Sequence, residues 1–262
     1  MKATFEVMFS PAEFETLSRR DLSQTICVVF DVLRATSTMA MALSNGAAAV
    51  VPVASIPEAL RRRQQQAAVL LAGEREGVRI QARLTGGIAF DLGNSPREFT
   101  RQRVQGKTIV MTTTNGTRAL RACAGARKVL ICSFLNLRAT AHFLAKANPP
   151  RLLLVCGGTV EEPSYEDALG AGALCDLLWP RRRDAVVADS ALMARRLFRA
   201  EAGDLAAALG RSRNGRRLLA LAELREDVAF CAQRDLLNLA AGMGEDGAVR
   251  KLWRRPTGSA RQ

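Results

Sequence analysis

At 262 residues and 48% hydrophobic content, the chain is long enough to bury the core of one large globular domain or two small ones. No apolar run approaches the roughly 18 residues of a membrane span, and six scattered cysteines with a single histidine argue against both a disulfide framework and a zinc site, so we expect a cytoplasmic protein without membrane association. The net charge of +13 comes mainly from arginines spread along the chain without a nucleic-acid-binding motif, which indicates solvated surface rather than a nucleic-acid site.

From its first residues onward, the apolar pattern of the chain predicts alternating strands and helices. An alternating strand over residues 2–9 is followed by a short helix over 11–19. Near-continuous apolar runs then predict strands over 26–31, 49–53, 69–72, 108–112, 129–132 and 152–156. Helical spacing predicts helices over 37–45, 57–66, 117–123, 137–146 and 165–178. This alternation predicts an α/β fold, a layered α/β/α arrangement around a parallel or mixed sheet covered on both faces.

After residue 180 the pattern becomes mainly helical, with predicted helices over 188–199, 205–208 and 214–230. We therefore expect three parts: an α/β catalytic core over residues 1–180, a helical C-terminal extension over 181–245 that packs on the core, and a basic tail over 246–262. The tail has too little apolar material to pack independently, so we expect it to be poorly ordered.

The first of three polar junctions follows the strand CVVFD. Asp31 ends this strand, and Arg34, Thr36 and Ser37 come before the next helix. A carboxylate and a guanidinium at the tip of a buried strand are costly unless they hold something. We expect Asp31 to bind a metal or act as a base and Arg34 to clamp phosphate, whereas the two hydroxyls could instead be ordinary helix caps.

The second junction, TTTNGT, places hydroxyls, an Asn-Gly turn and a helix start in direct succession. Thr114, Asn115, Gly116 and Thr117 are its candidate anion-binding residues, with Arg118 just behind. No G-x-x-x-x-G-K-[ST] motif occurs, so a nucleoside triphosphate is not indicated. The alternative is a tight turn that caps a helix.

The third junction, CGGTVEEPSYED, combines a glycine pair with four carboxylates near a helix start. Glu166 and Asp167, together with Asp31, would supply the oxygen ligands that Mg²⁺ needs. Acidic residues in a first helical turn also favour the helix dipole without any ligand, so a purely structural role is the alternative.

Two weaker stretches could contribute to the same site. The GER segment after the strand VLLA could add the carboxylate of Glu74 and the guanidinium of Arg75. In the loop FDLGNSPREF, Asn94 and Ser95 could reach a ligand. Each stretch could equally be a structural turn.

Three known phosphatase mechanisms can be tested against the residue spacing. The covalent aspartate route needs Asp-x-Asp, but Leu33 stands at the second position, and His142, alone on an amphipathic helix, is interpreted as structural. The pair Cys132 and Arg138 fits the C-x5-R spacing of cysteine phosphatases. Such matches are expected by chance among so many arginines, and the loop between them lacks glycines, so we do not favour this route.

Polar junctions at the carboxyl edge of one parallel sheet would form a crevice suited to an anion. Carboxylates, hydroxyls and arginines in one crevice indicate phosphate chemistry assisted by a divalent cation, with a small anionic phosphate ester as substrate. A second acidic group on that ester could be met by Arg75 or Arg118. The rival interpretation is a noncatalytic binding protein for an anionic metabolite or nucleic acid. The residues do not determine the oligomeric state, and a homodimer is one alternative.

Several motifs together resemble the 2-phosphosulfolactate phosphatase (ComB) family, in order over residues 25–240: DVLRATSTMAMAL, FDLGNSPREF, GKTIVMTTTNGTRAL, SFLN, SRNGRRLL and CAQRDLLNL. The resemblance implies an α/β fold of its own and a magnesium-dependent phosphatase that converts 2-phosphosulfolactate to sulfolactate and phosphate, a step of coenzyme M synthesis. It also implies that anion and metal are bound by residues of the three junctions: Asp31, Arg34, Thr36, Ser37, Asn115, Gly116, Thr117, Glu166 and Asp167.

Overall fold

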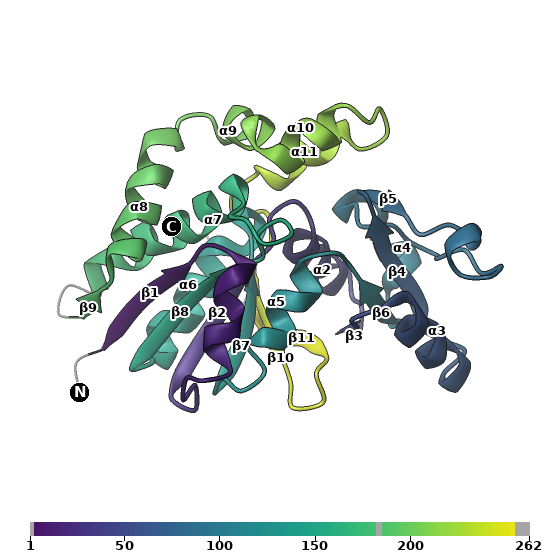
Figure 1. Cartoon of the computed structure of the whole chain (residues 1–262), viewed down its shortest axis with the longest axis horizontal. Coiled ribbons are helices and arrows are strands. Elements are labelled where there is room, and N and C mark those ends of the chain that lie inside the picture. Colours follow the sequence, from purple (N-terminus) through teal and green to yellow (C-terminus); the bar gives the residue numbers. More distant parts are fainter. Residues whose placement is uncertain (1–2, 182–184, 255–262) are drawn as a thin grey trace, which may run out of the picture.

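The structure of the chain is a computed structural model that describes residues 3–181 and 185–254. In this part of the chain, eleven strands form one mixed sheet (Figure 1). They are β1 (Thr4–Met8), β2 (Thr25–Phe30), β3 (Ala49–Pro52), β4 (Leu70–Arg75), β5 (Val78–Arg79), β6 (Thr108–Thr112), β7 (Lys128–Cys132), β8 (Arg151–Cys156), β9 (Val186–Val187), β10 (Leu239–Met243) and β11 (Val249–Arg254). Their order in the sheet is β5-β4-β6-β3-β11-β10-β7-β2-β8-β1-β9. The predicted α/β fold class is confirmed.

Helices connect most of these strands. The α-helices are α1 (Phe14–Leu17), α2 (Ala35–Ser44), α3 (Ile56–Gln65), α4 (Arg101–Val104), α5 (Gly116–Ala122), α6 (Leu137–Ala147), α7 (Tyr165–Leu178), α8 (Asp189–Glu201), α9 (Leu205–Arg211), α10 (Arg213–Leu219) and α11 (Arg225–Cys231). Short 3-10 turns are η1 (Pro11–Glu13), η2 (Ala82–Leu84), η3 (Pro96–Glu98), η4 (Phe134–Asn136) and η5 (Trp179–Arg181). None of the helices in the described ranges is long and apolar enough to span a membrane.

Both faces of the sheet are covered, as its apolar strands predict. Along β2, Ile26, Val28 and Phe30 pack into a cluster with residues of α6 to α11. The intervening Cys27 and Val29 pack into a second cluster with residues of α1, α2 and α5. Because successive side chains of a strand point to opposite faces, this alternation places one apolar layer on each side of the sheet.

The sheet consists of two parallel blocks that run in opposite directions. One block contains β4, β6 and β3, and the other contains β7, β2, β8, β1 and β9. The pairings β3–β11, β11–β10 and β10–β7 are all antiparallel, so the direction reverses three times between the blocks. The expectation that every junction lies at the carboxyl edge of one parallel sheet is therefore wrong.

Twist largely cancels this reversal. Adjacent strands rotate by roughly 20–25° relative to each other, and six pairings separate β4 from β2 in the sheet order. The accumulated rotation, roughly 120–150° for β4 and roughly 100–125° for β6, which is five pairings from β2, turns their carboxyl ends towards the same side as that of β2. The polar junctions of both blocks can therefore converge.

The C-terminal part differs from its prediction at two places. The helix predicted over 214–230 is two helices, α10 and α11. The chain then returns to the sheet as β10 and β11, although we expected a helical extension to 245 and a poorly ordered tail. The alanines and Gly242 of β10 have low strand propensity, so the sequence did not predict this strand. The glycine is needed there, because a Cβ on Gly242 would lie 2.5 Å from the carbonyl oxygen of Val129; its absence allows β10 to approach β7. Residues 255–262 of the predicted tail lie outside the described residues.

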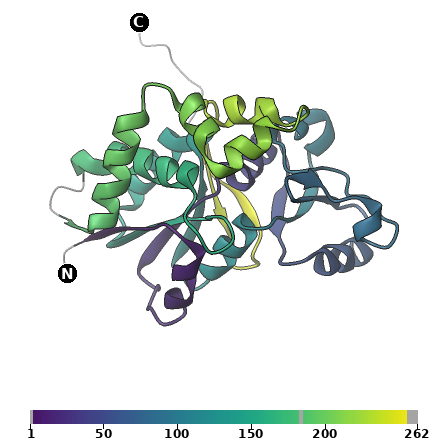
Figure 2. The same ribbon diagram turned by 45° about the horizontal axis from the view of Figure 1, so that its top comes forward.

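The helices between α7 and β10 cross the top of the molecule. Figures 1 and 2 show α9, α10 and α11 between α8 on one side and the β4–β5 region on the other. Residues of α8 to α11, among them Phe198, Leu209 and Val228, belong to the same apolar cluster as β2. This helical segment therefore shares the apolar core on one face of the sheet, where α8 contacts β1 and α9 contacts α7.

Candidate active site

A cavity of about 120 Å³ opens where these elements meet. It has room for several water-sized groups. Its walls come from both parallel blocks of the sheet and from the C-terminal helices. The lining residues are Asp31, Leu33, Arg34, Glu74, Gly77, Asn94, Thr113, Thr114, Asn115, Thr159, Val160, Asn214, Arg217 and Leu218.

Asp31 directly follows β2 and is only 8% exposed. Its Oδ1 accepts a hydrogen bond of 3.0 Å from the amide of Ala35. Burial raises the pKa of Asp31 to about 6, and the negative charges of Glu166 and Glu74 add to the rise. The hydrogen bond from Ala35 acts in the opposite direction, because it stabilises the charged carboxylate. Asp31 is therefore a carboxyl group at the wall of the cavity whose pKa lies well above its ordinary value.

Glu166 and Asp167 lie in the first turn of α7 and are 1% and 2% exposed. Burial raises the pKa of both carboxyl groups, and for Asp167 the charges of Glu166 and Asp31 contribute further. Asp167 is held on both sides, because its Oδ1 accepts from the amide of Val32 at 2.8 Å and its Oδ2 from the amide of Gly158 at 3.0 Å. The three predicted carboxylates are thus brought together, and Asp167 joins the first and third junctions.

Glu166 keeps one oxygen uncommitted. Its Oε1 accepts from the side-chain amide of Asn214 at 2.6 Å, whereas its Oε2 is buried and has no hydrogen-bond partner in the described part of the chain. Buried polar atoms without a partner are costly and call for an explanation. A cation beside Oε2 would supply one.

The donor set fits a magnesium ion in its chemistry. Within residues 3–181 and 185–254, no three acidic, histidine or cysteine side chains form a complete ligand cluster. Magnesium is usually held by only one or two carboxylates, together with water and substrate phosphate. Asp31 and Glu166 could supply such carboxylates, whereas both oxygens of Asp167 are already engaged by backbone amides.

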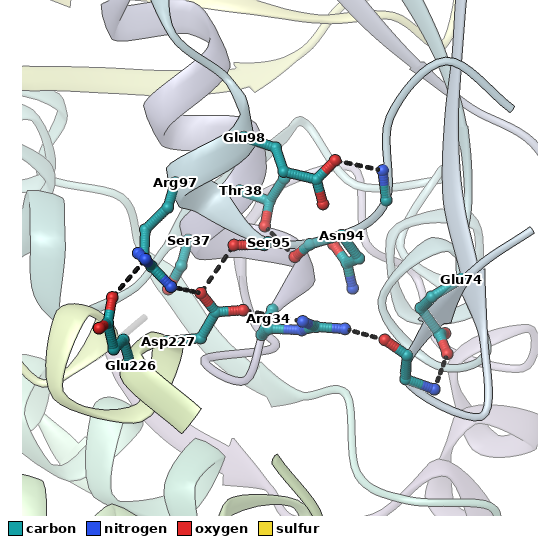
Figure 3. Close-up of polar contacts among 12 residues, drawn as sticks. Arg34, Ser37, Thr38, Glu74, Asn94, Ser95, Arg97, Glu98, Glu226 and Asp227 are labelled. Carbon is teal, nitrogen blue, oxygen red and sulfur yellow. Dashed lines mark hydrogen bonds and ion pairs between the residues drawn. The ribbon is translucent and has the colours of Figure 1, made fainter. Parts of the chain in front are cut away.

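Arg34 follows the cis peptide bond between Leu33 and Arg34 and is 3% exposed. Its Nη1 forms an ion pair of 2.8 Å with Asp227, and its Nη2 donates to the carbonyl of Gly77 at 2.5 Å (Figure 3). Asp227 also accepts from the hydroxyl of Ser95 at 2.7 Å. The predicted guanidinium therefore lies at the cavity, held in one orientation by α11 and the β4–β5 turn.

Asp227 was missed by the sequence analysis. It stands among Val228 and Cys231 on the buried face of α11 and Leu224 directly before the helix. A carboxylate at helical spacing within an apolar face is the signal that could have identified it, because a buried charge requires a partner.

Three predicted ligand-binding hydroxyls are instead part of the scaffold. Thr36 donates to the carbonyl of Cys132 at 2.8 Å, Ser37 to that of Val32 at 2.9 Å, and Thr117 to that of Thr113 at 3.1 Å. The side chains of Thr36, Ser37 and Thr117 are buried, and none of the three lines the cavity. The structure therefore does not bring these hydroxyls to the place where a ligand would bind.

The TTTNGT segment is also largely committed to internal hydrogen bonds. The amide and the hydroxyl of Thr114 both donate to Oε1 of Glu74 at 2.9 Å, while the amide of Gly77 donates to Oε2 at 2.8 Å. The side-chain carbonyl of Asn115 accepts from the amide of Val160 at 3.4 Å. Thr114 and Asn115 line the cavity as predicted, but they join its walls rather than offering an empty anion-binding loop.

Gly116 has a steric role. A Cβ at this position would lie 2.7 Å from Oδ2 of Asp31 and 2.6 Å from the Cβ of Ala35. The absence of a side chain lets the start of α5 pack against the first junction.

The two weaker stretches have different outcomes. Arg75 does not line the cavity; it donates to the carbonyl of Glu74 at 2.6 Å and to the hydroxyl of Thr112 at 3.2 Å. Asn94 does line it, is 5% exposed, and has an Oδ1 with no partner within the described residues. Glu74, the carboxylate of the GER segment, lines the cavity. Asn214 and Arg217 are lining residues that the predicted site did not include.

The structure does not support Cys132 as a nucleophile. Burial raises the pKa of the Cys132 thiol to about 12, so it is protonated at neutral pH. Arg138 points elsewhere and pairs with Asp235 at 3.0 Å. His142 lies on α6 and does not line the cavity.

Comparison with known proteins agrees with the resemblance seen in the motifs. The family model of 2-phosphosulpholactate phosphatase matches residues 12–244. A probable 2-phosphosulfolactate phosphatase of Symbiobacterium thermophilum is 41% identical over 221 residues, which cover 84% of this chain and 91% of the relative. The corresponding protein of Thermotoga petrophila is 41% identical over 80% of this chain and 85% of its own. That of Caldicellulosiruptor saccharolyticus is 37% identical over 83% and 88%.

Proposed function

The chain belongs to the 2-phosphosulfolactate phosphatase family, and from this premise we propose that it hydrolyses 2-phosphosulfolactate to 3-sulfolactate and phosphate in a magnesium-dependent reaction. The observation that carries the proposal is that Asp31 and Arg34 line one cavity. Glu166 does not line it, but its buried carboxylate is close enough to Asp31 to raise the pKa of Asp31. Buried carboxylates and a fixed guanidinium are the groups that hold a cation and phosphate oxygens in metal-assisted phosphoryl transfer.

Asp31 and Glu166 would hold the magnesium ion through the cavity-facing carboxylate of Asp31 and Oε2 of Glu166. When bound, such an ion neutralises phosphate charge and makes water a better nucleophile. Asp167 would position this pair, because its hydrogen bonds to the amides of Val32 and Gly158 fix the first and third junctions relative to each other.

Arg34 would stabilise the negative charge on the phosphoryl oxygens. Its ion pair with Asp227 and its hydrogen bond to Gly77 leave further N–H groups of the guanidinium for a ligand. Because the orientation is set before substrate arrives, little reorganisation is needed as charge develops during the reaction. Asn94 also lines the cavity, and the Nδ2 group of its side-chain amide would donate a hydrogen bond to the substrate.

Phosphate release from 2-phosphosulfolactate tests the proposal. Wild type with Mg²⁺ should release phosphate, EDTA should abolish the release, and Asp31→Asn should lower kcat by about 100-fold or more. Asp189→Asn is the matched control, because Asp189 is an exposed aspartate on α8 outside the cavity.

Two results would contradict parts of this proposal. Wild type that binds the ester without releasing phosphate would show a noncatalytic binding protein. Unchanged magnesium-dependent turnover in Asp31→Asn would remove Asp31 from the mechanism.

A further inference from the structure

The charges that line the cavity are balanced before any ligand binds. Its acidic lining residues are Asp31 and Glu74, and its basic ones are Arg34 and Arg217. The charge of Arg34 is already met by Asp227, which is buried behind it. A substrate with several negative groups therefore needs a further cationic group, and Arg217 is the lining arginine not yet committed.

Arg217 differs from the other arginines around α10. Arg211 pairs with Glu201, Arg213 pairs with Glu162, and Arg216 donates to the carbonyl of Arg211. Over residues 3–181 and 185–254, the guanidinium of Arg217 forms no ion pair. An unpaired guanidinium at a cavity wall is suited to a ligand anion, because its planar fork binds oxyanions with two parallel hydrogen bonds.

The position of Arg217 separates it from the buried carboxylates. Asp31 and Arg34 are buried at the inner wall, whereas Arg217 is exposed. Its Nε lies 3.9 Å from the place where a Cβ on Gly77 would stand, and the carbonyl of the same Gly77 accepts from Arg34. Arg34 and Arg217 therefore flank one turn, one on the inner side and one at the opening.

The substrate of the proposed function has three anionic groups. Its phosphate and its carboxylate are both attached at C2, and its sulfonate is on the next carbon, farther from the reacting phosphorus. With the phosphate at Asp31 and Arg34, the sulfonate is the anionic group with the longest reach from the inner wall. On the basis of the proposed function, we infer that Arg217 binds the sulfonate and determines the selectivity for a sulfonated phosphate ester.

A comparison of two substrates in three variants tests this inference. Arg217→Gln should lower kcat/KM for 2-phosphosulfolactate by about tenfold or more. The second substrate, 2-phospholactate, retains the carboxylate but lacks the sulfonate. For this ester the loss of kcat/KM should be smaller by a factor of about five or more. Arg217→Lys should fall between wild type and Arg217→Gln, because it keeps the charge and loses the planar fork. Arg216→Gln is the matched control; this neighbouring exposed arginine does not line the cavity.

Binding of 3-sulfolactate, measured by calorimetry, gives a readout that does not need turnover. Arg217→Gln should weaken this binding by about tenfold, whereas Arg216→Gln should change it by less than about twofold. Equal losses for both phosphate esters, or equal 3-sulfolactate binding with and without Arg217, would overturn the inference. Wild type that hydrolyses no 2-phosphosulfolactate would instead contradict the proposed function, a result separable from the binding measurement.

Discussion

The guanidinium of Arg34 and the carboxylate of Asp227 form an ion pair of 2.8 Å whose side chains are 2% and 0% exposed. The two residues are separated by 193 positions in the sequence. The pair connects the end of β2 with α11, and Ser95 adds the loop over 94–98 through its hydrogen bond to the same carboxylate (Figure 3). The C-terminal helices are therefore part of the site and not only a cover on the core.

Replacing Asp227 should uncouple this connection. Asp227→Asn would leave the buried guanidinium of Arg34 without its counter-charge, and breaking one side of a buried pair costs about 3–5 kcal/mol. Chemical denaturation should show this loss, and kcat/KM should fall because Arg34 is no longer held in one orientation. Glu226→Gln is the control, since the adjacent Glu226 is 69% exposed and pairs with Arg97. Equal stability of the two variants would show that the buried pair contributes nothing.

Gly116 should be sensitive to the smallest substitution. Gly116→Ala would improve helix propensity by about 1 kcal/mol, but the new Cβ would meet Oδ2 of Asp31 at 2.7 Å. We expect the clash to dominate, with a net loss of about 1–3 kcal/mol and reduced phosphatase activity. Gly125→Ala is the matched control, because a Cβ there meets no atom within 4 Å. Wild-type activity in Gly116→Ala would mean that Asp31 tolerates displacement.

The neighbouring acids Glu166 and Asp167 should respond in opposite ways. Glu166→Gln replaces a carboxyl group whose pKa is raised by burial with a neutral amide, so the stability in EDTA should be unchanged or higher. The stabilisation of the folded protein by Mg²⁺ should be lost in this variant. Asp167→Asn replaces an acceptor of the Val32 and Gly158 amides with a donor, so stability in EDTA should fall by about 1–3 kcal/mol. Thermal unfolding with EDTA and with Mg²⁺ distinguishes the two. If both variants were less stable than wild type in EDTA, the carboxylate of Glu166 would not destabilise the folded protein, and this prediction would be wrong.

The raised pKa of Asp31 predicts a pH dependence of stability. The pKa of Asp31 is about 6 in the folded protein, compared with an ordinary value of 3.8. The folded state therefore binds a proton on Asp31 more tightly than the unfolded state does. The resulting stabilisation is present below about pH 4 and is lost as the pH rises through 6, amounting to about 3 kcal/mol.

The contribution of Asp31 can be isolated by comparison with a neutral variant. In EDTA, the free energy of unfolding of wild type minus that of Asp31→Asn should decrease between pH 4 and pH 6 and level off above. Magnesium should oppose this decrease, because it favours the charged carboxylate. A difference that increases with pH would show that Asp31 is not destabilised by burial.

Much of the fold could be predicted from local sequence. The apolar runs of β2 and β6 and the helical spacing of α7 each lie within a short window, and their periodicity determines which face of each element is buried. The same local reasoning placed Asp31 at the end of a buried strand and Glu166 at a helix start. A charged residue next to an apolar run is visible without any tertiary information.

Long-range contacts decided the rest. The direction of the β4–β6–β3 block depends on the hairpin of β10 and β11, whose alanines and basic residues carry little strand signal on their own. Whether a hydroxyl such as that of Thr36 on α2 faces a ligand or a backbone carbonyl depends on a residue far away in the sequence, here Cys132 at the end of β7. The sequence alone therefore determined the elements and the kinds of chemical group at their ends, because both are local properties. Only the tertiary structure decided which of these groups share the cavity, because burial and partner choice arise from segments far apart in the chain.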